Sequence, residues 1–242
     1  MPFAEPGVKP HYAPSRSVRI THIDLRLSLE PVQKTFRGEA VLHVQPLLSY
    51  DGRVVFDLDE VEVLAVTDAR GEELSYGHQD GQLTVRQASP SVIKVTWQGE
   101  SPRCGLYFTG PTEQEPERQH MAWTQCQDED GHFVFPCHDH PGVRHTWSIH
   151  LDAPSGYTLL SNGACVSHEE RDGRAHAHYE MRDSMPPYLF TAVAALLTCV
   201  DSEWRGRPVR YFVPVGQEEA VLRSMAKTPL MIEEYSRVPL TF

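Results

Sequence analysis

The feature that most constrains this chain is an alternation of apolar and polar side chains that begins at Val18. Alternation with a period of two places apolar side chains on one face of a β-strand and polar side chains on the other. Residues 20–29 separate into two such rows: Ile20, His22, Asp24, Arg26 and Ser28 against Thr21, Ile23, Leu25, Leu27 and Leu29. Residues 36–44 repeat the pattern, with Ala40, Leu42 and Val44 on one side. Both segments are therefore expected to be half-buried strands.

Further strand candidates follow at intervals of roughly ten to fifteen residues, a spacing typical of an antiparallel all-β domain. They cover Arg53–Asp57, Glu62–Asp68, Gln82–Gln87, Ser91–Gln98, Arg144–Ala153, Tyr157–Asn162 and Ala175–Met181. Asp-Gly, Arg-Gly and Ser-Gly dipeptides mark the turns between several of them, at residues 51–52, 70–71, 80–81, 155–156 and 172–173. Tyr188–Val200 is apolar on both faces and is expected to be a central, fully buried strand.

The pattern changes near Gly216, where helical periodicity first appears. Gln217–Ala226 places Val221, Leu222 and Met225 on one stripe, and Thr228-Pro229 resembles the start of a second helix over Pro229–Ser236. The sequence thus predicts an extended leader in residues 1–15, a β-rich domain in residues 16–214 and a helical segment in residues 215–242. We expect that segment to begin a further domain that is missing from this chain.

Charge and cysteine content limit the possible partners and the compartment. The chain carries 22 basic and 33 acidic residues, a formal charge of −11, which argues against nucleic acid or an anionic membrane as a partner. The chain has no apolar run long enough to span a bilayer, and its first residues lack a charged region followed by an apolar core, so no secretory signal is expected. Its five cysteines are an odd set without a CxxC pair. Reduced thiols in a cytoplasmic protein are expected, with a Cys126–Cys137 disulfide as the alternative.

Histidines form the most conspicuous candidate for local chemistry: His132, His138, His140, His145 and His150. Cys126, Cys137, Asp128 and Asp139 lie nearby in the sequence, and such residue types build zinc sites. The spacing matches no local zinc motif, so an ordinary histidine-rich loop is the competing interpretation. A nucleophilic role for Cys126 near His132 or His138 is a further alternative, although no Gly-x-Ser-x-Gly elbow or phosphate-binding loop is present.

Two short motifs indicate a relationship to known enzymes. Thr124-Gln125-Cys126-Gln127 and Pro136-Cys137-x-Asp139-x-Pro141 resemble the substrate-facing strand and loop of zinc aminopeptidases of the aminopeptidase N and leukotriene hydrolase family. Weaker similarities occur in the same order along nearly the whole chain: Thr35-Phe-Arg-Gly38, Gly105-Leu-Tyr-Phe108, Leu159-Leu-Ser-Asn-Gly163, Pro187-Tyr-Leu-Phe190 and Arg210-Tyr-Phe-Val-Pro214. The family's Gly-x-Met-Glu-Asn strand and His-Glu-x-x-His helix are not among these 242 residues.

The resemblance implies an amino-terminal domain built on a large, twisted antiparallel, saddle-like sheet. Gln127 matches the position whose Gln or Glu side chain binds the free α-amino group of the peptide, and Gln125 matches a residue lining the pocket for the first side chain. A side-chain carbonyl oxygen can accept hydrogen bonds from a terminal ammonium group. The resemblance assigns zinc to the complete enzyme, and no metal ligand or catalytic residue to this chain. His138 and His140 occupy variable positions of the family loop and inherit no role.

Two functions are compatible with this pattern. In the first, the chain is the cleft-forming domain of a cytoplasmic metallo-aminopeptidase and is inactive without its catalytic domain. In the second, it is a noncatalytic interaction or scaffolding module with the same fold, because fold alone does not fix function. In the first case, the Gln125–Gln127 face and the stripe of Val221, Leu222 and Met225 are expected to be exposed or buried by self-association.

Overall fold

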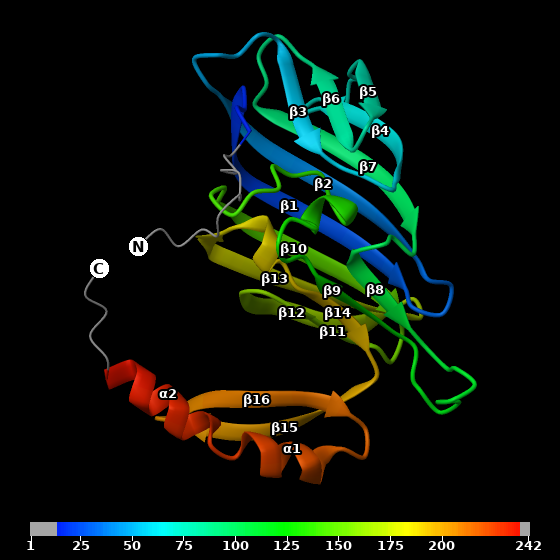
Figure 1. The fold of residues 1–242 in the computed structure, drawn as a ribbon, viewed down its shortest axis with the longest axis vertical. Helices are drawn as coiled ribbons and strands as arrows, with labels where there is room; N and C mark the ends of the chain where they lie inside the picture. The colour runs from blue at the N-terminus through cyan, green and yellow to red at the C-terminus, as the bar shows by residue number, and fades with distance from the viewer. Residues whose placement is uncertain (1–13, 238–242) are drawn as a thin grey trace, which may run out of the picture.

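A computed structural model describes residues 14–237, so nearly all of the expected leader and residues 238–242 lie outside the described part (Figure 1). Its largest element is a seven-stranded sheet. In spatial order its strands are β12 (Ala164–Arg171), β13 (Arg174–Met185), β10 (His145–Pro154), β1 (Val18–Glu30), β2 (Thr35–Pro46), β7 (Val92–Glu100) and β4 (Glu62–Asp68). The large, mostly β fold expected from the sequence is confirmed.

The sheet is mixed, because β1 and β10 pair in parallel. Its other neighbouring pairs are antiparallel, as expected. Antiparallel strands can be joined by a tight hairpin, whereas parallel strands need a long connection between them. The chain between Glu30 and His145 supplies that connection, and it contains β2 to β9.

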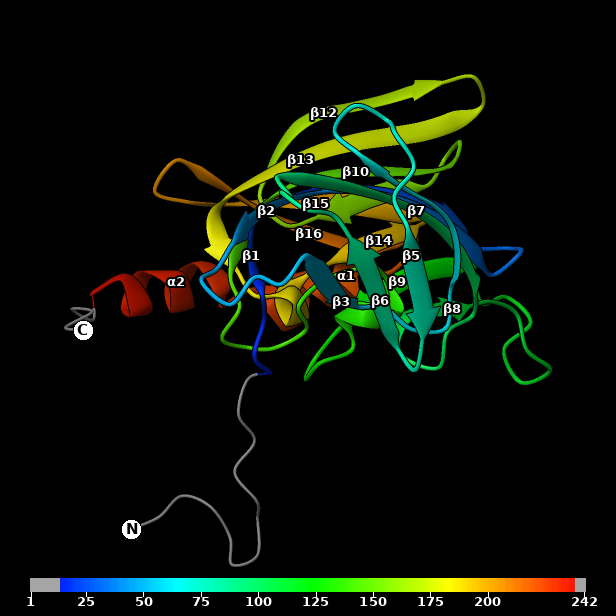
Figure 2. The same cartoon turned by 90° about the horizontal axis from the view of Figure 1, so that it is seen from above.

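Two smaller sheets lie beneath the curved large sheet (Figure 2). The four-stranded sheet has the order β11 (Thr158–Ser161), β14 (Ala192–Ala195), β9 (Met121–Gln125) and β8 (Gly105–Thr109). The three-stranded sheet has the order β3 (Arg53–Asp57), β6 (Gln82–Arg86) and β5 (Tyr76–Gln79). Two short 3-10 helices, Gly131–Phe133 and Pro187–Leu189, lie in the connections.

The core lies between the large sheet and the smaller ones. Ile23, Leu25, Leu27 and Leu29 of β1 are buried, as the alternation predicts. The placement of Ile20 in the polar row was wrong, because Ile20 is also buried. The pairing of β1 with β2 shifts register between Ile20 and His22, and this irregularity reverses which face the following residues occupy.

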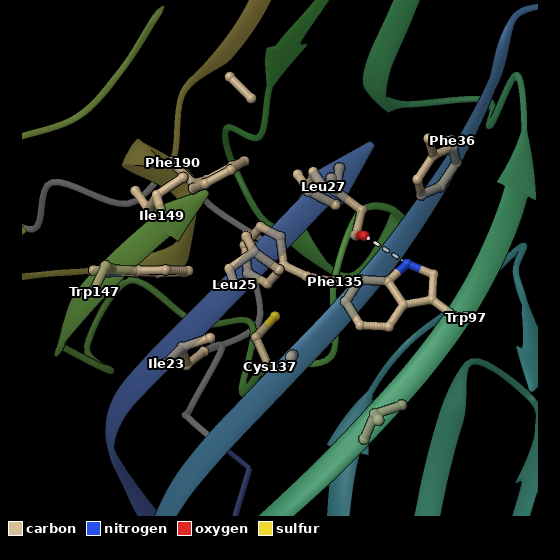
Figure 3. Close-up of a cluster of buried hydrophobic side chains, with 14 of the residues drawn as sticks. Ile23, Leu25, Leu27, Phe36, Trp97, Phe135, Cys137, Trp147, Ile149 and Phe190 are labelled. Carbon is tan, nitrogen blue, oxygen red and sulfur yellow. Dashed lines mark hydrogen bonds between the residues drawn. The ribbon is translucent and has the colours of Figure 1, made fainter. Parts of the chain in front are cut away.

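Two glycine–aromatic pairs join β2 to β7 in this core, and Figure 3 shows their aromatic members, Phe36 and Trp97. Gly38 lies opposite Trp97, and Phe36 lies opposite Gly99. A Cβ atom added to Gly38 would lie 2.1 Å from a carbon of the Trp97 ring, and one added to Gly99 would lie 2.5 Å from the Phe36 ring. The indole Nε1 of Trp97 donates a hydrogen bond of 3.0 Å to the carbonyl of Val134. The glycine of the Thr35–Gly38 motif therefore makes room for an indole ring.

The expectation of one buried strand over Tyr188–Val200 was wrong. The segment divides into the 3-10 helix Pro187–Leu189, the buried strand β14 and the start of β15 (Leu197–Trp204). Pro186 and Pro187 favour the tight turn, and β15 leaves the core to pair with β16 (Arg207–Pro214). That hairpin forms a two-stranded sheet of its own.

Two helices follow the hairpin, close to the positions expected from the sequence. They are α1 (Glu218–Met225) and α2 (Thr228–Arg237), and they contact β15 and β16 (Figure 1). Within residues 14–237, no helix is long and apolar enough to cross a membrane. The limits 16–214 and 215–242 remain predictions.

Candidate functional site

Strand β9 positions the first family motif. Alternation along the strand directs Ala122 and Thr124 toward the core and Trp123 and Gln125 away from it. The Thr124 hydroxyl accepts a hydrogen bond of 2.8 Å from the backbone N–H of Ala192, which fixes β9 to β14. Thr124 is therefore a structural residue. Trp123 and Gln125 project from the opposite, open face of β9.

The two glutamines lie together at the end of β9. Both side chains are exposed, and the Oε1 atom of Gln125 accepts a hydrogen bond of 3.3 Å from the backbone N–H of Gln127. The structure thus brings the two predicted site residues into direct contact on the surface. Between them, the Cys126 side chain is fully buried. This anchors the short segment that presents both amides.

The second motif is fixed to β3 by hydrogen bonds to Asp57. Asp57 and Cys137 exchange two backbone hydrogen bonds, of 2.8 and 3.2 Å. The Asp57 carboxylate also accepts a hydrogen bond of 2.9 Å from the backbone N–H of Asp139. The Asp139 carboxylate in turn accepts from the backbone N–H and the Nδ1–H of His132, at 2.9 and 2.8 Å. The Cys-x-Asp segment therefore serves to hold the loop in place.

The histidines near this loop have separate environments. His138 is buried, its Nε2 donates to the carbonyl of Val55 at 3.0 Å, and burial followed by the charge of Arg16 lowers its pKa to about 3. Burial likewise lowers the pKa of His145 to about 4. For His132, burial acts to lower the pKa, but the hydrogen bond and charge of Asp139 outweigh it, so the pKa is raised. His150 lies elsewhere, stacked on His178 with ring centroids 4.1 Å apart.

These histidines do not converge on a metal site. Among residues 14–237, no group of three His, Cys, Asp or Glu side chains is placed to hold a metal ion. The described residues therefore do not fit the zinc that the family resemblance implies, and no chemical step through zinc follows from them. The candidate zinc site at these five histidines therefore finds no geometric support in this part of the chain.

The cysteines of the two motifs are also structural. Cys126 and Cys137 are both buried and carry free thiols. Burial raises the pKa of each thiol well above its usual range, and the charge of Asp139 adds to the effect. A thiol acts as a nucleophile in its thiolate form, so these environments disfavour a nucleophilic role for Cys126.

An apolar row on the outer face of the four-stranded sheet was not anticipated from the sequence. Tyr107 pairs with Trp123, Trp123 with Val193, and Val193 with Leu160. These four side chains are half-buried, whereas their neighbours Leu106, Ala122, Ala192 and Ala194 lie on the buried side. The row lies next to Gln125 on β9. Recognising it requires the pairing of all four strands, which local alternation does not provide.

Comparison with known proteins decides the relationship that the motifs suggest. The model of the peptidase M1 N-terminal domain matches residues 9–189. This chain belongs to the peptidase M1 N-terminal domain family. The family assignment covers both glutamines, the Cys-x-Asp loop and all strands up to β13.

Relatives of this M1 domain are much longer proteins. Aminopeptidase M1 of Arabidopsis thaliana is 28% identical over 191 residues, covering 77% of this chain and 20% of that protein. Aminopeptidase B of Rattus norvegicus is 26% identical over 223 residues, covering 79% of this chain and 33% of that protein. The fold is similar to the M1 zinc metallopeptidase from Deinococcus radiodurans, with a TM-score of 0.65 and 18% identity over 88% of this chain and 53% of that one. The chain spans between a fifth and about half of these relatives.

Proposed function

We propose that this domain forms one wall of the substrate cleft of a metallo-aminopeptidase, an enzyme that removes residues from the amino terminus of peptides. The observation that carries the proposal is that Gln125 and Gln127 are both exposed at the end of β9, where the Gln125 side chain accepts a hydrogen bond from the Gln127 backbone N–H. The family match gives the pair its context, because relatives carrying this domain are named aminopeptidases.

In this proposal Gln127 accepts hydrogen bonds from the free α-ammonium group of the peptide. An ammonium group carries three hydrogen-bond donors. The side chain of Gln127 is uncharged, and its carbonyl oxygen can accept a hydrogen bond from one of them. Fixing that end of the peptide determines which bond lies in the cleft, so orientation gives the exopeptidase specificity. A variant of the Deinococcus radiodurans relative was crystallised with a Tyr-Ser-Ala substrate, which supports a short peptide as the ligand class.

Gln125 has a second role in the proposal, lining the space for the first side chain of the substrate. Its exposed amide lies on the same face of β9 as Trp123. The hydrogen bond from the Gln127 backbone to the Gln125 side chain orients that amide in the absence of substrate.

The metal and the groups that activate water are proposed to lie in another part of the complete protein. Zinc is the metal implied by the family, and the described residues contain no group able to hold it. The 242-residue chain alone is therefore expected to have no peptidase activity. A metal bound elsewhere would supply Lewis-acid activation of the peptide carbonyl, while this domain orients the amino terminus.

The C-terminal part of the chain carries apolar side chains that the rest of the catalytic domain would cover. Leu222 and Met225 of α1 and Leu230, Met231 and Tyr235 of α2 are exposed, whereas Val221 is buried. An apolar surface of this kind on adjacent helices is typical of an interface. We propose that residues 16–214 form the cleft-lining domain, and that residues 215–242 begin the catalytic domain.

A cytoplasmic location is part of the same proposal. Cys126 and Cys137 are buried, unpaired thiols in the core of the domain. Free thiols of this kind are typical of reducing compartments.

The test is a comparison of two alanine variants in the complete protein that carries this chain. Gln127→Ala is expected to raise KM for alanine and leucine anilides at least tenfold, because the ammonium loses its acceptor. Gln125→Ala is expected to change the ranking of substrates more than the rate for any one of them. Gln98→Ala, on the large sheet and bonded to Glu62, is the matched control and should leave both unchanged.

Two results would refute the proposal. Wild-type protein that shows no aminopeptidase activity on any anilide would exclude the enzyme assignment. Wild-type activity with Gln127→Ala kinetics equal to those of Gln98→Ala would exclude Gln127 as the amine-binding residue.

A further inference from the structure

The apolar row on the four-stranded sheet begins with an aromatic pair. The rings of Tyr107 and Trp123 are stacked, with centroids 4.9 Å apart and an interplanar angle of 24°. Tyr107 is the cross-strand partner of Trp123 across β8 and β9, so the backbone pairing holds the two rings together. The stack is preformed and flat, and both rings are only half-buried in the described chain.

The aromatic pair lies beside the proposed peptide-binding amides. Trp123 and Gln125 are two residues apart on β9 and project from the same face. Successive side chains on one face of a strand are about 7 Å apart, which is the length of a single large side chain. Gln125 is paired with Gly105, and the carbonyl oxygen of Asp130 lies 2.3 Å from the position that a Gly105 Cβ atom would take, so that side of Gln125 is already filled. An apolar group entering beside Gln125 would therefore meet the Trp123 ring.

The rest of the face argues for an apolar ligand at this position. The Trp123 partner on the other side is Val193, and the row contains no charged side chain from Tyr107 to Leu160. Stacked aromatic rings offer a large apolar surface that loses little conformational freedom on binding. The charged side chains near the row, Glu115, Glu117 and Arg118, line the hollow at its Val193–Leu160 end.

We propose that Trp123, supported by Tyr107, is a specificity-determining residue that forms the wall for a large apolar or aromatic first side chain of the peptide. The inference rests on the proposed aminopeptidase function and names the substrate class for it. Gln127 holds the ammonium group, Gln125 borders the first side chain, and the Trp123 ring covers the apolar surface of that side chain.

The other end of the row has different neighbours. Leu160 and Val193 line a hollow of about 810 Å³ together with Met121, Leu197 and Phe212.

The experiment measures kcat/KM for alanine, leucine, phenylalanine and lysine anilides with the complete protein. Wild-type protein is expected to prefer the leucine and phenylalanine substrates. Trp123→Ala is expected to lower kcat/KM for those two at least tenfold and for alanine less than twofold, because a methyl group does not reach the ring. The loss should appear mainly in KM, as expected for a lost binding contact.

Three further variants separate this role from a structural one. Trp123→Phe keeps a flat apolar wall and should retain most of the preference. Tyr107→Ala removes the supporting ring and should weaken the preference in the same direction as Trp123→Ala. Leu160→Ala, at the far end of the same row, is the matched control and should leave the ranking unchanged. Melting temperatures of all variants identify any that fail to fold.

Each contrary outcome has a distinct meaning. A wild-type preference for alanine or lysine overturns the inference and leaves the aminopeptidase proposal intact. A uniform loss for all four substrates in Trp123→Ala also overturns it, because the ring would then support the structure of the site without discriminating between first side chains. Wild-type protein without activity on any anilide refutes the proposed function, and the inference falls with it.

Discussion

Trp97 occupies the space that a side chain at position 38 would need. The position of a Gly38 Cβ atom lies 2.1 Å from a carbon of the indole, well inside van der Waals contact. The indole is held there by its hydrogen bond to Val134, and the whole Trp97 side chain is buried. The large sheet and the loop that supports the candidate site are thus joined through one ring.

Gly38→Ala is therefore expected to destabilise the domain by about 2–3 kcal/mol, because the indole must move in a closely packed core. The measurement is urea unfolding followed by tryptophan fluorescence. Gly77→Ala on β5 is the matched control, since nothing lies within 4 Å of its Cβ position. Equal stabilities of the two variants would show that the core accommodates the methyl group.

Acidification is expected to weaken the fold through His138 and His145. Their pKa values of about 3 and about 4 lie below the ordinary value of 6.5, so the unfolded chain binds protons that the folded chain does not. Their stabilising contribution is present above pH 6.5 and is lost as the pH falls toward the folded values. Between pH 7 and pH 5 the two histidines together are expected to remove about 2–4 kcal/mol of stability.

Urea unfolding of His138→Phe at several pH values tests this expectation. Burial beside Phe56 favours an aromatic replacement, and the variant should show a weaker fall in stability on acidification than wild type. His168→Gln, at an exposed histidine, should follow the wild-type curve. His132 acts in the opposite sense, because its raised pKa adds stability below pH 6.5 that is lost as the pH rises. A flat pH profile for wild type would contradict the assignment.

The hydroxyl of Thr124 is expected to be worth about 1–3 kcal/mol, because Thr124→Val leaves the Ala192 N–H without its acceptor. Thr109→Val on β8 is the control. The Thr109 hydroxyl is buried without a hydrogen-bond partner, so its removal should be neutral or stabilising. Chemical denaturation of both variants gives the comparison. A Thr124→Val cost no larger than that of Thr109→Val would contradict the role of Thr124 in joining β9 to β14.

The isolated 242-residue chain is expected to self-associate at high concentration. The exposed apolar side chains of α1 and α2 would be covered in that state. Light scattering should show a mass that rises with concentration, and the double variant Leu222→Glu/Met225→Glu should remain monomeric. Val32→Glu, at an isolated exposed valine, is the control. A wild-type chain that stays monomeric at every concentration would argue against this surface as an interface.

Local alternation predicted most of the strands but not their partners. The limits of β3 and β4 agree with those expected from the sequence. Strand β12 was missed because all eight of its residues are exposed, so no buried row marks it. The parallel pairing of β1 with β10 was missed because it joins residues 124 positions apart in the sequence, such as His22 and Thr146. Alternation within one segment carries no information about such a pairing.

The candidate site was predicted only in part, and mainly through family resemblance. Local physics indicates that Gln125 and Gln127 are polar residues near a strand end, but nothing in the alternation distinguishes them from other surface amides. Their contact, and the stack of Tyr107 on Trp123, depend on the geometry of two strands and a loop. The histidine-rich segment has the residue types of a metal site. Whether such side chains converge depends on their directions, which a sequence does not give.

The parallel seam between β1 and β10 also affects how the domain can be made on the ribosome. Strands β1, β2, β4 and β7 are complete once residue 100 has been synthesised, and they can pair with one another. The edge of β1 that pairs with β10 stays unpaired until β10, which ends at Pro154, has been synthesised. For about fifty residues of translation, the nascent chain carries half a sheet with an unpaired edge, the form of β structure most prone to pair with the wrong partner.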